Sequence, residues 1–441
     1  MTSVNVKSVN VKSAPRNAFY AQSGGVTAVI NASACGLIEE ARQHQNLIGK
    51  VYAGRDGIIG ALTEDLIDTS KEPAAAIAKL RHTPGGAFGS CRYKLKSSSE
   101  SGASTTAGST AEYERLIAVF RAHDIGYFFY NGGNDSMDTA HKIAQFSSEA
   151  GYPLACIGIP KTIDNDLVGT DNCPGFGSVA KYVATSMREA GMDVASMART
   201  STKVFVMEVM GRHAGWITAA CGLAAGRDGD APQVLLLPEI KFDADKFIAK
   251  VKVTVDQYGY CAIAVSEGLR NADGTFMAET GLTDAFGHAQ LGGVAPLIAR
   301  LVQERLGYKY HWAVADYLQR AARHIASATD VEQSYRLGQA AVKLAVGGQS
   351  GVMAAIIRTS THPYRWHIKP VPLAEVANLE KNMPSEFISE DGFHITQACR
   401  DYLLPLIAGE DPPPYRNGLP DYVRLKNVAV PKKLAESFTI R

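Results

Sequence analysis

The sequence lacks the features that mark membrane, nucleic-acid-binding or secreted proteins. Its 441 residues hold no apolar run of membrane-spanning length. Lys plus Arg (45) balance Asp plus Glu (44), so no overall charge favours a nucleic acid or an anionic membrane surface. Residues 1–13 repeat Val-Asn-Val-Lys-Ser without the apolar core of a signal peptide, and we expect a flexible tail over 1–15. We therefore expect a cytoplasmic protein that binds neither membrane nor nucleic acid, so any affinity for anions must be local.

Cysteine pairs and two well-known phosphate-binding signatures are also missing. The seven cysteines, from Cys35 to Cys399, form no Cys-x-x-Cys pair, which argues against a disulfide framework and a structural zinc site. Neither the Walker spacing nor Gly-x-Gly-x-x-Gly occurs. The compartment is predicted to be reducing, and the protein is predicted to be neither a standard P-loop protein nor a carrier of the dinucleotide fingerprint.

Apolar runs typical of strands alternate with helical patterns along most of the chain. The strand candidates are 17–22, 51–53, 125–130, 154–159, 204–209, 234–237 and 262–265. This alternation predicts an α/β chain with mainly parallel sheets and helices on both faces. Trp216 and residues 218–225 are expected to form a buried helix without a chemical role.

Two acidic-amide runs directly follow buried strand candidates. Gly132-Gly133-Asn134-Asp135-Ser136 follows the strand 125–130, and Pro160-Lys161-Thr162-Ile163-Asp164-Asn165-Asp166 follows the strand 154–159. The carboxyl edge of a parallel sheet is where ligands bind, because helix N-termini and free N–H groups gather there. A phosphate site is therefore the first hypothesis.

The second run supplies two carboxylates and a cation. In an extended segment Asp164 and Asp166 point to the same face, so they can share a metal ion or divide base and metal roles. Lys161 adds a fixed positive charge, which suits magnesium-assisted phosphoryl transfer. The alternative is a simple turn in which Asp and Asn cap a helix.

Three other segments carry weaker signals. The order strand, Ser23-Gly24-Gly25-Val26-Thr27, helix suits a phosphate loop, although glycine pairs more often make ordinary turns. Residues 96–110 are almost all small and polar, as in a mobile loop near the site or a passive linker. Proline-rich stretches after Pro363 suggest a tail that wraps over the domains.

Taken in order, these motifs resemble the phosphofructokinase family from about Phe19 to Met353. The motifs are Gly24-Gly25, Gly89-Ser90-Cys91-Arg92, 132–136, 160–166, Met207-Glu208-Val209-Met210-Gly211-Arg212, Ser266-Glu267-Gly268 and Gly287-His288-Ala289-Gln290. The resemblance implies two Rossmann-like lobes with the active site in the cleft. It implies a larger donor-binding lobe (16–175 and 290–345), a smaller fructose 6-phosphate-binding lobe (176–289 and 346–385) and a C-terminal extension (386–441).

The resemblance also implies catalytic and metal-binding roles. Asp164 would take the proton from the 1-hydroxyl of fructose 6-phosphate, and Thr162 would help to position the sugar and the phosphoryl group. Lys161 would stabilise the transition state. Asp166 and Asn134 would lie near Mg²⁺, although an amide at 134 brings no charge to the metal.

A second set of residues would contact the sugar phosphate. The resemblance gives Met210, Gly211 and Arg212 to the sugar-contacting segment, with Glu267 as a hydrogen-bond acceptor. His288 would lie near the 6-phosphate. The alternatives are a surface ion pair of Arg212 with Glu267 and a purely structural histidine.

The donor site carries the residues that distinguish two branches of the family. Gly25 and Arg92 would hold the phosphoryl donor. ATP-dependent members usually have glycine where this chain has Asp135 and Lys161. The Asp135 carboxylate would repel the α-phosphate of ATP, so the pair resembles the pyrophosphate-dependent branch.

Some positions depart from the short ATP-dependent members. Leu282 and Leu291 stand where those members have arginines for the sugar phosphate, and the resemblance assigns that role to Arg320, with Tyr317. Lys203 replaces an arginine that crosses a subunit contact, so it keeps the charge but loses the bidentate fork. The resemblance favours a homodimer.

The sequence thus predicts magnesium-dependent transfer from pyrophosphate to fructose 6-phosphate, giving fructose 1,6-bisphosphate and phosphate in a reversible glycolytic step. An ATP-dependent 6-phosphofructokinase is the first alternative. A non-catalytic sugar-phosphate-binding regulatory subunit is the second.

Overall fold

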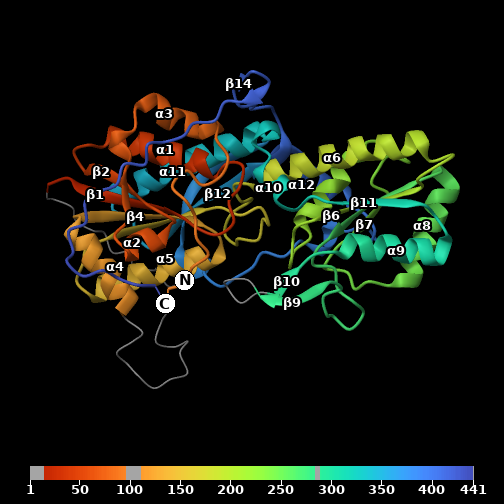
Figure 1. Cartoon of the computed structure of the whole chain (residues 1–441), viewed down its shortest axis with the longest axis horizontal. Helices are drawn as coiled ribbons and strands as arrows, with labels where there is room; N and C mark the ends of the chain where they lie inside the picture. The colour runs from red at the N-terminus through yellow and green to blue at the C-terminus, as the bar shows by residue number, and fades with distance from the viewer. Residues whose placement is uncertain (1–13, 96–110, 284–288, 441) are drawn as a thin grey trace.

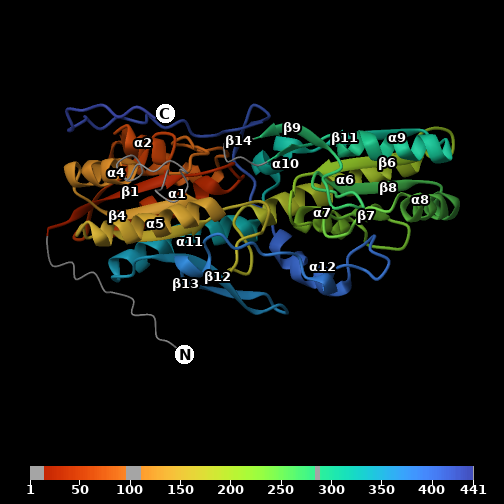
Figure 2. The same cartoon turned by 90° about the horizontal axis from the view of Figure 1, so that it is seen from below.

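Two large sheets, each flanked by helices, organise the chain into two lobes that lie side by side (Figures 1 and 2). The computed structural model describes residues 14–95, 111–283 and 289–440. The tail 1–13, the segment 96–110 and His288 lie outside these residues, as do the side chains of 280–290.

The larger lobe is built on a seven-stranded sheet in the order β13-β12-β5-β4-β1-β2-β3. Its strands are β1 (Arg16–Gln22), β2 (Ile48–Gly54), β3 (Leu66–Asp68), β4 (Ile125–Gly132), β5 (Ala155–Pro160), β12 (Val352–Ser360) and β13 (Arg365–Pro372). The five inner strands are parallel, and β3 and β13 are antiparallel edges. Every residue of β4 is buried, as expected where helices cover both faces of a parallel sheet.

Helices cover the two faces of this sheet. One face packs on α1 (Ile30–Gln43) and α11 (Ala328–Val346) through Tyr127 and Phe129. The other packs on α2 (Ile58–Leu62), α4 (Ala111–Ala122) and α5 (Asn134–Glu149) through Phe128 and Tyr130. Alternate residues of β4 thus serve opposite cores, which is the two-residue period of a strand.

The smaller lobe contains a four-stranded parallel sheet in the order β11-β6-β8-β7. Its strands are β6 (Val204–Val209), β7 (Val234–Leu236), β8 (Cys261–Ser266) and β11 (Tyr310–Val314). The helices α6 (Phe176–Met197) and α7 (Trp216–Cys221) pack on one face, and α8 (Ala244–Tyr258) and α9 (Val294–Leu306) on the other. Trp216 and the residues after it are buried, which confirms the predicted helix.

The remaining elements are short. They are α3 (Ala74–Lys79), α10 (Asp316–Ala321), α12 (Gln397–Leu403), β9 (Glu279–Thr283), β10 (Ala289–Leu291), β14 (Tyr415–Arg416), β15 (Leu419–Pro420) and the 3-10 helices Thr69–Lys71, Leu80–His82, Gly222–Ala224, Arg323–Ile325, Leu373–Glu375, Ser385–Phe387 and Leu404–Ile407. Within the described residues, no helix combines the length and apolar character needed to cross a bilayer.

The predicted division into lobes assigns two segments of the chain to the wrong lobe. The strands β12 and β13, predicted for the smaller lobe, join the larger sheet, where Val352 pairs with Ile157. Conversely, α9 and β11 were predicted for the larger lobe but belong to the smaller one. The strand β11 joins the smaller sheet, where Tyr310 pairs with Val204, and α9 packs on that sheet. Hydrogen-bond partners, and not chain order, decide which sheet a strand joins, so the predicted division is corrected at these segments.

The C-terminal chain contacts both lobes. Cys399 and Leu403 of α12 pack into the core of the smaller lobe. Farther on, the chain crosses the larger lobe (dark blue in Figures 1 and 2), where the Asp68 N–H donates to the Val428 carbonyl at 2.9 Å and the Val430 N–H donates to the Leu66 carbonyl at 2.8 Å. The prediction of a wrapping tail is confirmed for these residues.

Close packing of α1 on α11 gives a test of the fold. A Cβ on Gly36 would lie 2.1 Å from the Tyr335 carbonyl oxygen. We therefore expect Gly36→Ala to destabilise the protein by about 1–3 kcal/mol, the usual cost of overpacking, although Gly→Ala inside a helix normally stabilises. Gly226→Ala is the control, since its Cβ would have no neighbour nearer than 3.6 Å. Denaturant unfolding of both variants measures the difference, and an equally stable Gly36→Ala would contradict the packing described.

Candidate active site

Loops after three neighbouring strands meet at the carboxyl edge of the larger sheet. The Ser23 N–H, after β1, donates to the Asn131 carbonyl at 2.9 Å. The Lys161 N–H, after β5, donates to the Gly132 carbonyl at 2.9 Å. Main-chain hydrogen bonds therefore join the loops at the edge predicted for ligand binding, and these loops carry the side chains of the acidic-amide runs.

The glycine loop after β1 is surrounded by cationic groups. The Lys161 ammonium donates to the Gly25 carbonyl at 2.7 Å. A Cβ on Gly25 would lie 2.5 Å from Arg320 Nη1 and 3.5 Å from Arg92 Nη2, and a Cβ on Gly24 would lie 3.2 Å from Lys161 Nζ. Glycine at these positions lets three cations approach the main chain, and such a group of cations suits an anionic ligand such as phosphate.

Lys161 occupies an electrostatically demanding position. Burial lowers the pKa of its ammonium to about 8; Arg92 and Arg320 also lower it, whereas Asp164 and Asp166 oppose the change. Because neighbouring positive charges disfavour the protonated lysine, a bound anion would favour it. The site is therefore built to receive negative charge.

The turn after β5 differs from the predicted extended segment. Asn165 has φ +55°, in the left-handed region, so Asp164 and Asp166 do not share one face as an extended chain would make them do. This corrects that expectation. The Asp164 N–H donates to Thr162 Oγ1 at 3.1 Å, and Thr162 Oγ1 donates to Asp164 Oδ2 at 3.4 Å. Asp166 instead turns to Asn134, whose Nδ2 donates to Asp166 Oδ2 at 3.1 Å.

Charged groups from both lobes influence Asp164. Burial raises the pKa of its carboxyl, and the positive charges of Lys161, Arg212 and Arg92 oppose that rise. Of these cations, Arg212 comes from the smaller lobe. In turn, the pKa of Glu267, also in the smaller lobe, is raised to about 7 by burial and then by the charge of Asp164. Charged residues of both lobes therefore influence the same carboxyl group.

Asn134 and Asp166 have the character of metal ligands. Asn134 Oδ1 and Asp166 Oδ1 are both buried without a hydrogen-bond partner. Burial and the nearby charge of Asp164 raise the pKa of Asp166 to about 7, so a cation there would offset an unfavourable negative charge. Among the described residues no group of three or more His, Cys, Asp or Glu is placed to hold a metal. The pair fits Mg²⁺, which commonly takes one or two protein oxygens and completes its shell with water and phosphate.

Asp135 lies in the first turn of α5, beside Asn134. The N-cap residue Gly133 has no side chain to cap the helix, so the helix N-terminus is left to stabilise the half-buried Asp135 carboxylate. Gly132 is required just before the helix, because a Cβ there would lie 2.0 Å from Ser136 Oγ. The carboxylate predicted to discriminate donors is thus at the same sheet edge as Lys161.

The loop after β6 and the end of β8 form the opposite wall. The Gly211 N–H donates to Glu267 Oε1 at 3.3 Å, and Ser266 Oγ donates to the Gly211 carbonyl at 2.6 Å. Gly211 has φ +125°, which a residue with a side chain rarely adopts. Arg212 Nε is buried without a hydrogen-bond partner in the part of the chain that the structure describes. The Glu267 carboxyl and Arg212 Nε are thus two polar groups on this wall that a ligand could contact.

The other predicted substrate residues lie in different surroundings. The Arg320 guanidinium stacks on the Tyr317 ring at 3.6 Å from its centroid. The Met210 N–H donates to the side-chain oxygen of buried Gln319 at 3.4 Å. Lys203 Nζ donates to the Ala198 carbonyl at 3.0 Å. His288 is not among the described residues.

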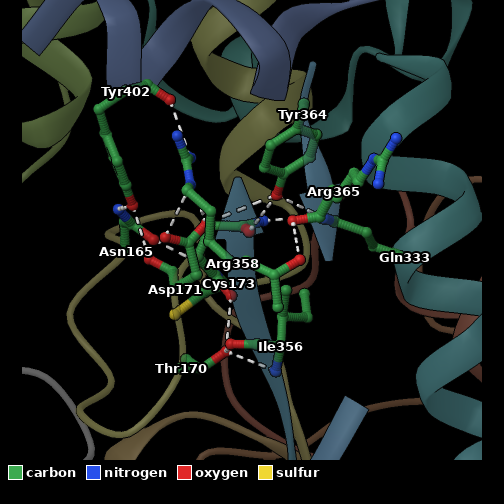
Figure 3. A network of polar contacts seen from close by, with 12 residues as sticks. Asn165, Thr170, Asp171, Cys173, Gln333, Ile356, Arg358, Tyr364, Arg365 and Tyr402 are labelled. Atoms are coloured by element: carbon green, nitrogen blue, oxygen red, sulfur yellow. Dashed lines mark hydrogen bonds and ion pairs between the residues drawn. The ribbon is translucent and has the colours of Figure 1, made fainter. Parts of the chain in front are cut away.

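Sequence reasoning missed three residues that support the turn formed by residues 164–166. Asn165 Nδ2 donates to the Tyr402 hydroxyl at 3.0 Å, and Lys381 Nζ donates to Asn165 Oδ1 at 3.4 Å (the Asn165–Tyr402 contact is drawn in Figure 3). In the sequence, Asn165 stands out only as part of an acidic run. Lys381 and Tyr402 lie 216 and 237 residues farther along the chain, and no local pattern marks them.

The geometry agrees with comparisons to known proteins. A family model described as phosphofructokinase matches residues 17–345, and the chain belongs to that family. A protein of Methylococcus capsulatus named pyrophosphate–fructose 6-phosphate 1-phosphotransferase is 67% identical over 427 residues, which cover 97% of this chain and 100% of that protein. A protein of Halomonas elongata with the same name is 63% identical over 423 residues, covering 96% and 99%. A crystal structure from Nitrosospira multiformis, titled as a pyrophosphate-dependent phosphofructokinase, matches with a TM-score of 0.88 at 62% identity, covering 97% of this chain and 100% of that one.

The two candidate metal ligands, Asn134 and Asp166, can be tested by measuring Mg²⁺ binding directly. We expect Asp166→Asn to weaken Mg²⁺ binding by about 10–100-fold, because it removes the only charged oxygen of the pair. Asp138→Asn is the matched control, since Asp138 lies in α5 but pairs with Lys142 at 2.8 Å and accepts from Asn378 Nδ2 at 3.0 Å. Titration calorimetry with Mg²⁺ and pyrophosphate measures both. Equal affinities for the two variants would exclude Asp166 as a ligand.

Proposed function

We propose that this protein transfers a phosphoryl group from pyrophosphate to the 1-hydroxyl of fructose 6-phosphate, with Mg²⁺. The observation that carries the proposal is the group of Lys161, Arg92 and Arg320 around the Gly25 main chain, facing Asp164. The proposed donor site, the proposed base and the two proposed metal ligands lie around this group. Relatives at 59–67% identity are named for this reaction.

We assign the proton transfer to Asp164. Its carboxylate would accept the proton of the sugar 1-hydroxyl, while Thr162, which is hydrogen-bonded to it, fixes its orientation. Lys161 would hold the transferring phosphoryl group and stabilise the departing phosphate through its ammonium. Phosphoryl transfer needs little covalent chemistry from the protein, so positioning and charge neutralisation account for most of the catalysis.

We assign Mg²⁺ to Asn134 Oδ1 and Asp166 Oδ1. When bound, Mg²⁺ supplies positive charge that neutralises the phosphate oxygens. The protein's part is to hold these two oxygens at the edge of the donor site, next to the cations of the glycine loop. The uncharged Asn134 leaves Asp166 as the only anionic ligand of the pair, so substrate phosphates would contribute much of the metal's binding.

We assign donor choice to Asp135 and Lys161. Pyrophosphate has no α-phosphate, whereas ATP would have to bring its α-phosphate toward the Asp135 carboxylate at the start of α5. The ATP-dependent alternative is disfavoured by this charge. The regulatory-subunit alternative is disfavoured because Asp164 and Lys161 are both present.

We assign the sugar phosphate to the wall formed by the smaller lobe. Glu267 and Arg212 would bind sugar hydroxyls and phosphate, with Gly211 and Met210 providing main-chain contacts. Arg320, stacked on Tyr317 and lying against Gly25, is within reach of the donor loop as well, and we propose that it binds the 6-phosphate from the boundary between the two substrates. His288 completes this set in the proposal.

We also propose a homodimer, formed through the edge strand β11. Trp312 of this strand is 46% exposed and Leu318 of the adjoining α10 is 67% exposed. The Lys203 N–H donates to the Lys309 carbonyl at 3.0 Å, so the cation predicted to reach a neighbouring subunit lies at the same edge.

All seven cysteines are unpaired, which supports a reducing compartment, and we propose the cytoplasm.

The base assignment gives the direct test of this proposal. Asp164→Asn is expected to lower kcat by about 10²–10⁴-fold, because an amide cannot accept the proton. Binding of fructose 6-phosphate should change little, since other groups hold the sugar. Steady-state kinetics and calorimetry measure the two effects, and a kcat near that of the wild type would remove Asp164 from the mechanism.

The donor assignment predicts opposite effects at two positions. Asp135→Gly should allow measurable turnover with ATP, because the repelling carboxylate is gone. Lys161→Met should lower kcat with pyrophosphate by about 10²–10³-fold, the usual loss for one preorganised electrostatic group. Assays of each variant with both donors measure the change. If Asp135→Gly still ignores ATP, the carboxylate is not what excludes it.

A further inference from the structure

The chain beyond the family-model match reaches back to the catalytic turn. The match ends at residue 345, yet Lys381 and Tyr402 both contact Asn165, the residue between Asp164 and Asp166. We propose that this C-terminal segment positions the catalytic turn, with Tyr402 and Lys381 as positioning residues that act through Asn165. The proposal rests on the roles proposed above for Asp164 and Asp166.

Asn165 controls the directions of both carboxylates. Its φ of +55° is a conformation that asparagine tolerates better than most residues. The side chain is fully buried and both of its polar atoms are bonded: Nδ2 to the Tyr402 hydroxyl, and Oδ1 to Lys381 Nζ and to the Cys173 N–H at 3.0 Å. A rotation at Asn165 would move Asp164 away from Lys161 or Asp166 away from Asn134, so these contacts act on the geometry of the site.

Tyr402, in α12, is locked at both ends. Its ring packs on Trp216 at a centroid distance of 5.3 Å and on Phe387 at 5.6 Å. Its hydroxyl donates to the Asp171 carbonyl at 2.6 Å and accepts from Asn165 (Figure 3). The hydroxyl therefore uses its single donor on the Asp171 main chain and an acceptor site on the Asn165 side chain.

Lys381 attaches the chain to the same turn through its main chain and its ammonium. The Lys381 N–H donates to the Asp166 carbonyl at 2.7 Å, and Glu380 forms a β-bridge with Leu167. The ammonium donates to the Asp171 carbonyl at 2.8 Å and to the Thr170 carbonyl at 3.3 Å. One residue thus holds the Asn165 side chain and the main chain that follows it, at residues 166, 170 and 171.

A second layer holds Tyr402 in place. Arg358 of β12 pairs with Asp171, its Nε lying 3.0 Å from each carboxylate oxygen, and Arg358 Nη2 donates to the Tyr402 carbonyl at 3.0 Å (Figure 3). The guanidinium also lies over the rings of Tyr402 and Tyr364, at 4.6 and 4.8 Å from their centroids. Tyr364 belongs to this layer, but its hydroxyl bonds with Gln333 and the 171–172 segment and does not contact Asn165.

The test compares two tyrosine hydroxyls of the same network. Tyr402→Phe removes the hydroxyl that bonds Asn165 and keeps the ring. We expect kcat to fall by about 10–100-fold, the usual range when a supporting partner of an active-site ligand is lost, while KM for fructose 6-phosphate changes less than about twofold. Mg²⁺ binding, measured by calorimetry without turnover, should weaken as well. In the control Tyr364→Phe, kcat and Mg²⁺ binding should stay within about twofold of the wild type.

A double-mutant cycle then separates positioning from general stability. Asn165→Gly keeps access to the left-handed conformation and removes the side-chain contacts of residue 165 with Tyr402, Lys381 and Cys173. If Tyr402 acts through Asn165, Tyr402→Phe should lower kcat by less than about twofold in the Asn165→Gly background. Full additivity of the two losses would overturn the proposal. So would a lower Tm for Tyr402→Phe with kcat and Mg²⁺ binding unchanged.

Different results would contradict the catalytic role of Asp164 and the positioning role of Tyr402. If Asp164→Asn keeps turnover, the proposed catalytic role itself is wrong. If Asp164→Asn loses turnover but Tyr402→Phe behaves as Tyr364→Phe does, only the positioning role of the C-terminal segment is wrong.

Discussion

The proposed activity depends on the close approach of three loops at one edge of the seven-stranded sheet. Main-chain hydrogen bonds from Ser23 to Asn131 and from Lys161 to Gly132 hold these loops in contact. Glycine at 25 leaves room for the Arg320 side chain of α10, and glycine at 132 leaves room for the Ser136 side chain at the start of α5. Because the loops touch, Lys161 of the loop after β5 reaches the Gly25 carbonyl of the loop after β1. Cations thus collect where no single segment of the chain has an excess of charge.

This concentration of positive charge is balanced by carboxylates with distinct environments. Asp164 lies among Lys161, Arg92 and Arg212, whereas Asp166 pairs with the amide of Asn134. The left-handed turn at Asn165 is what separates them. The proposed base and the proposed metal ligand can therefore stand two residues apart in the chain and serve different parts of the proposed reaction.

The sequence predicted the elements that local patterns define. The strand β6 begins and ends at the predicted residues 204–209, and β4 and β5 lie where their apolar runs indicated, so the motifs that follow them were placed at the correct sheet edge. Sheet membership of β11 and β12 was not predictable, because partner choice depends on contacts between distant segments. The same reason explains why Lys381 and Tyr402 were missed: a lysine and a tyrosine in a loop-rich region carry no pattern that points to Asn165. The left-handed conformation at Asn165 was not predicted, because the run Asp164-Asn165-Asp166 is equally compatible with an extended segment.

The central claim is that the site takes pyrophosphate and not ATP as its donor. A competition experiment tests it most directly: wild-type protein, Mg²⁺ and fructose 6-phosphate are mixed with equal concentrations of pyrophosphate and ATP, and ³¹P NMR follows every phosphorus signal. The account predicts that pyrophosphate disappears, that inorganic phosphate and a sugar phosphate at carbon 1 appear, and that the ATP signals stay constant. Consumption of ATP with pyrophosphate left intact would contradict it.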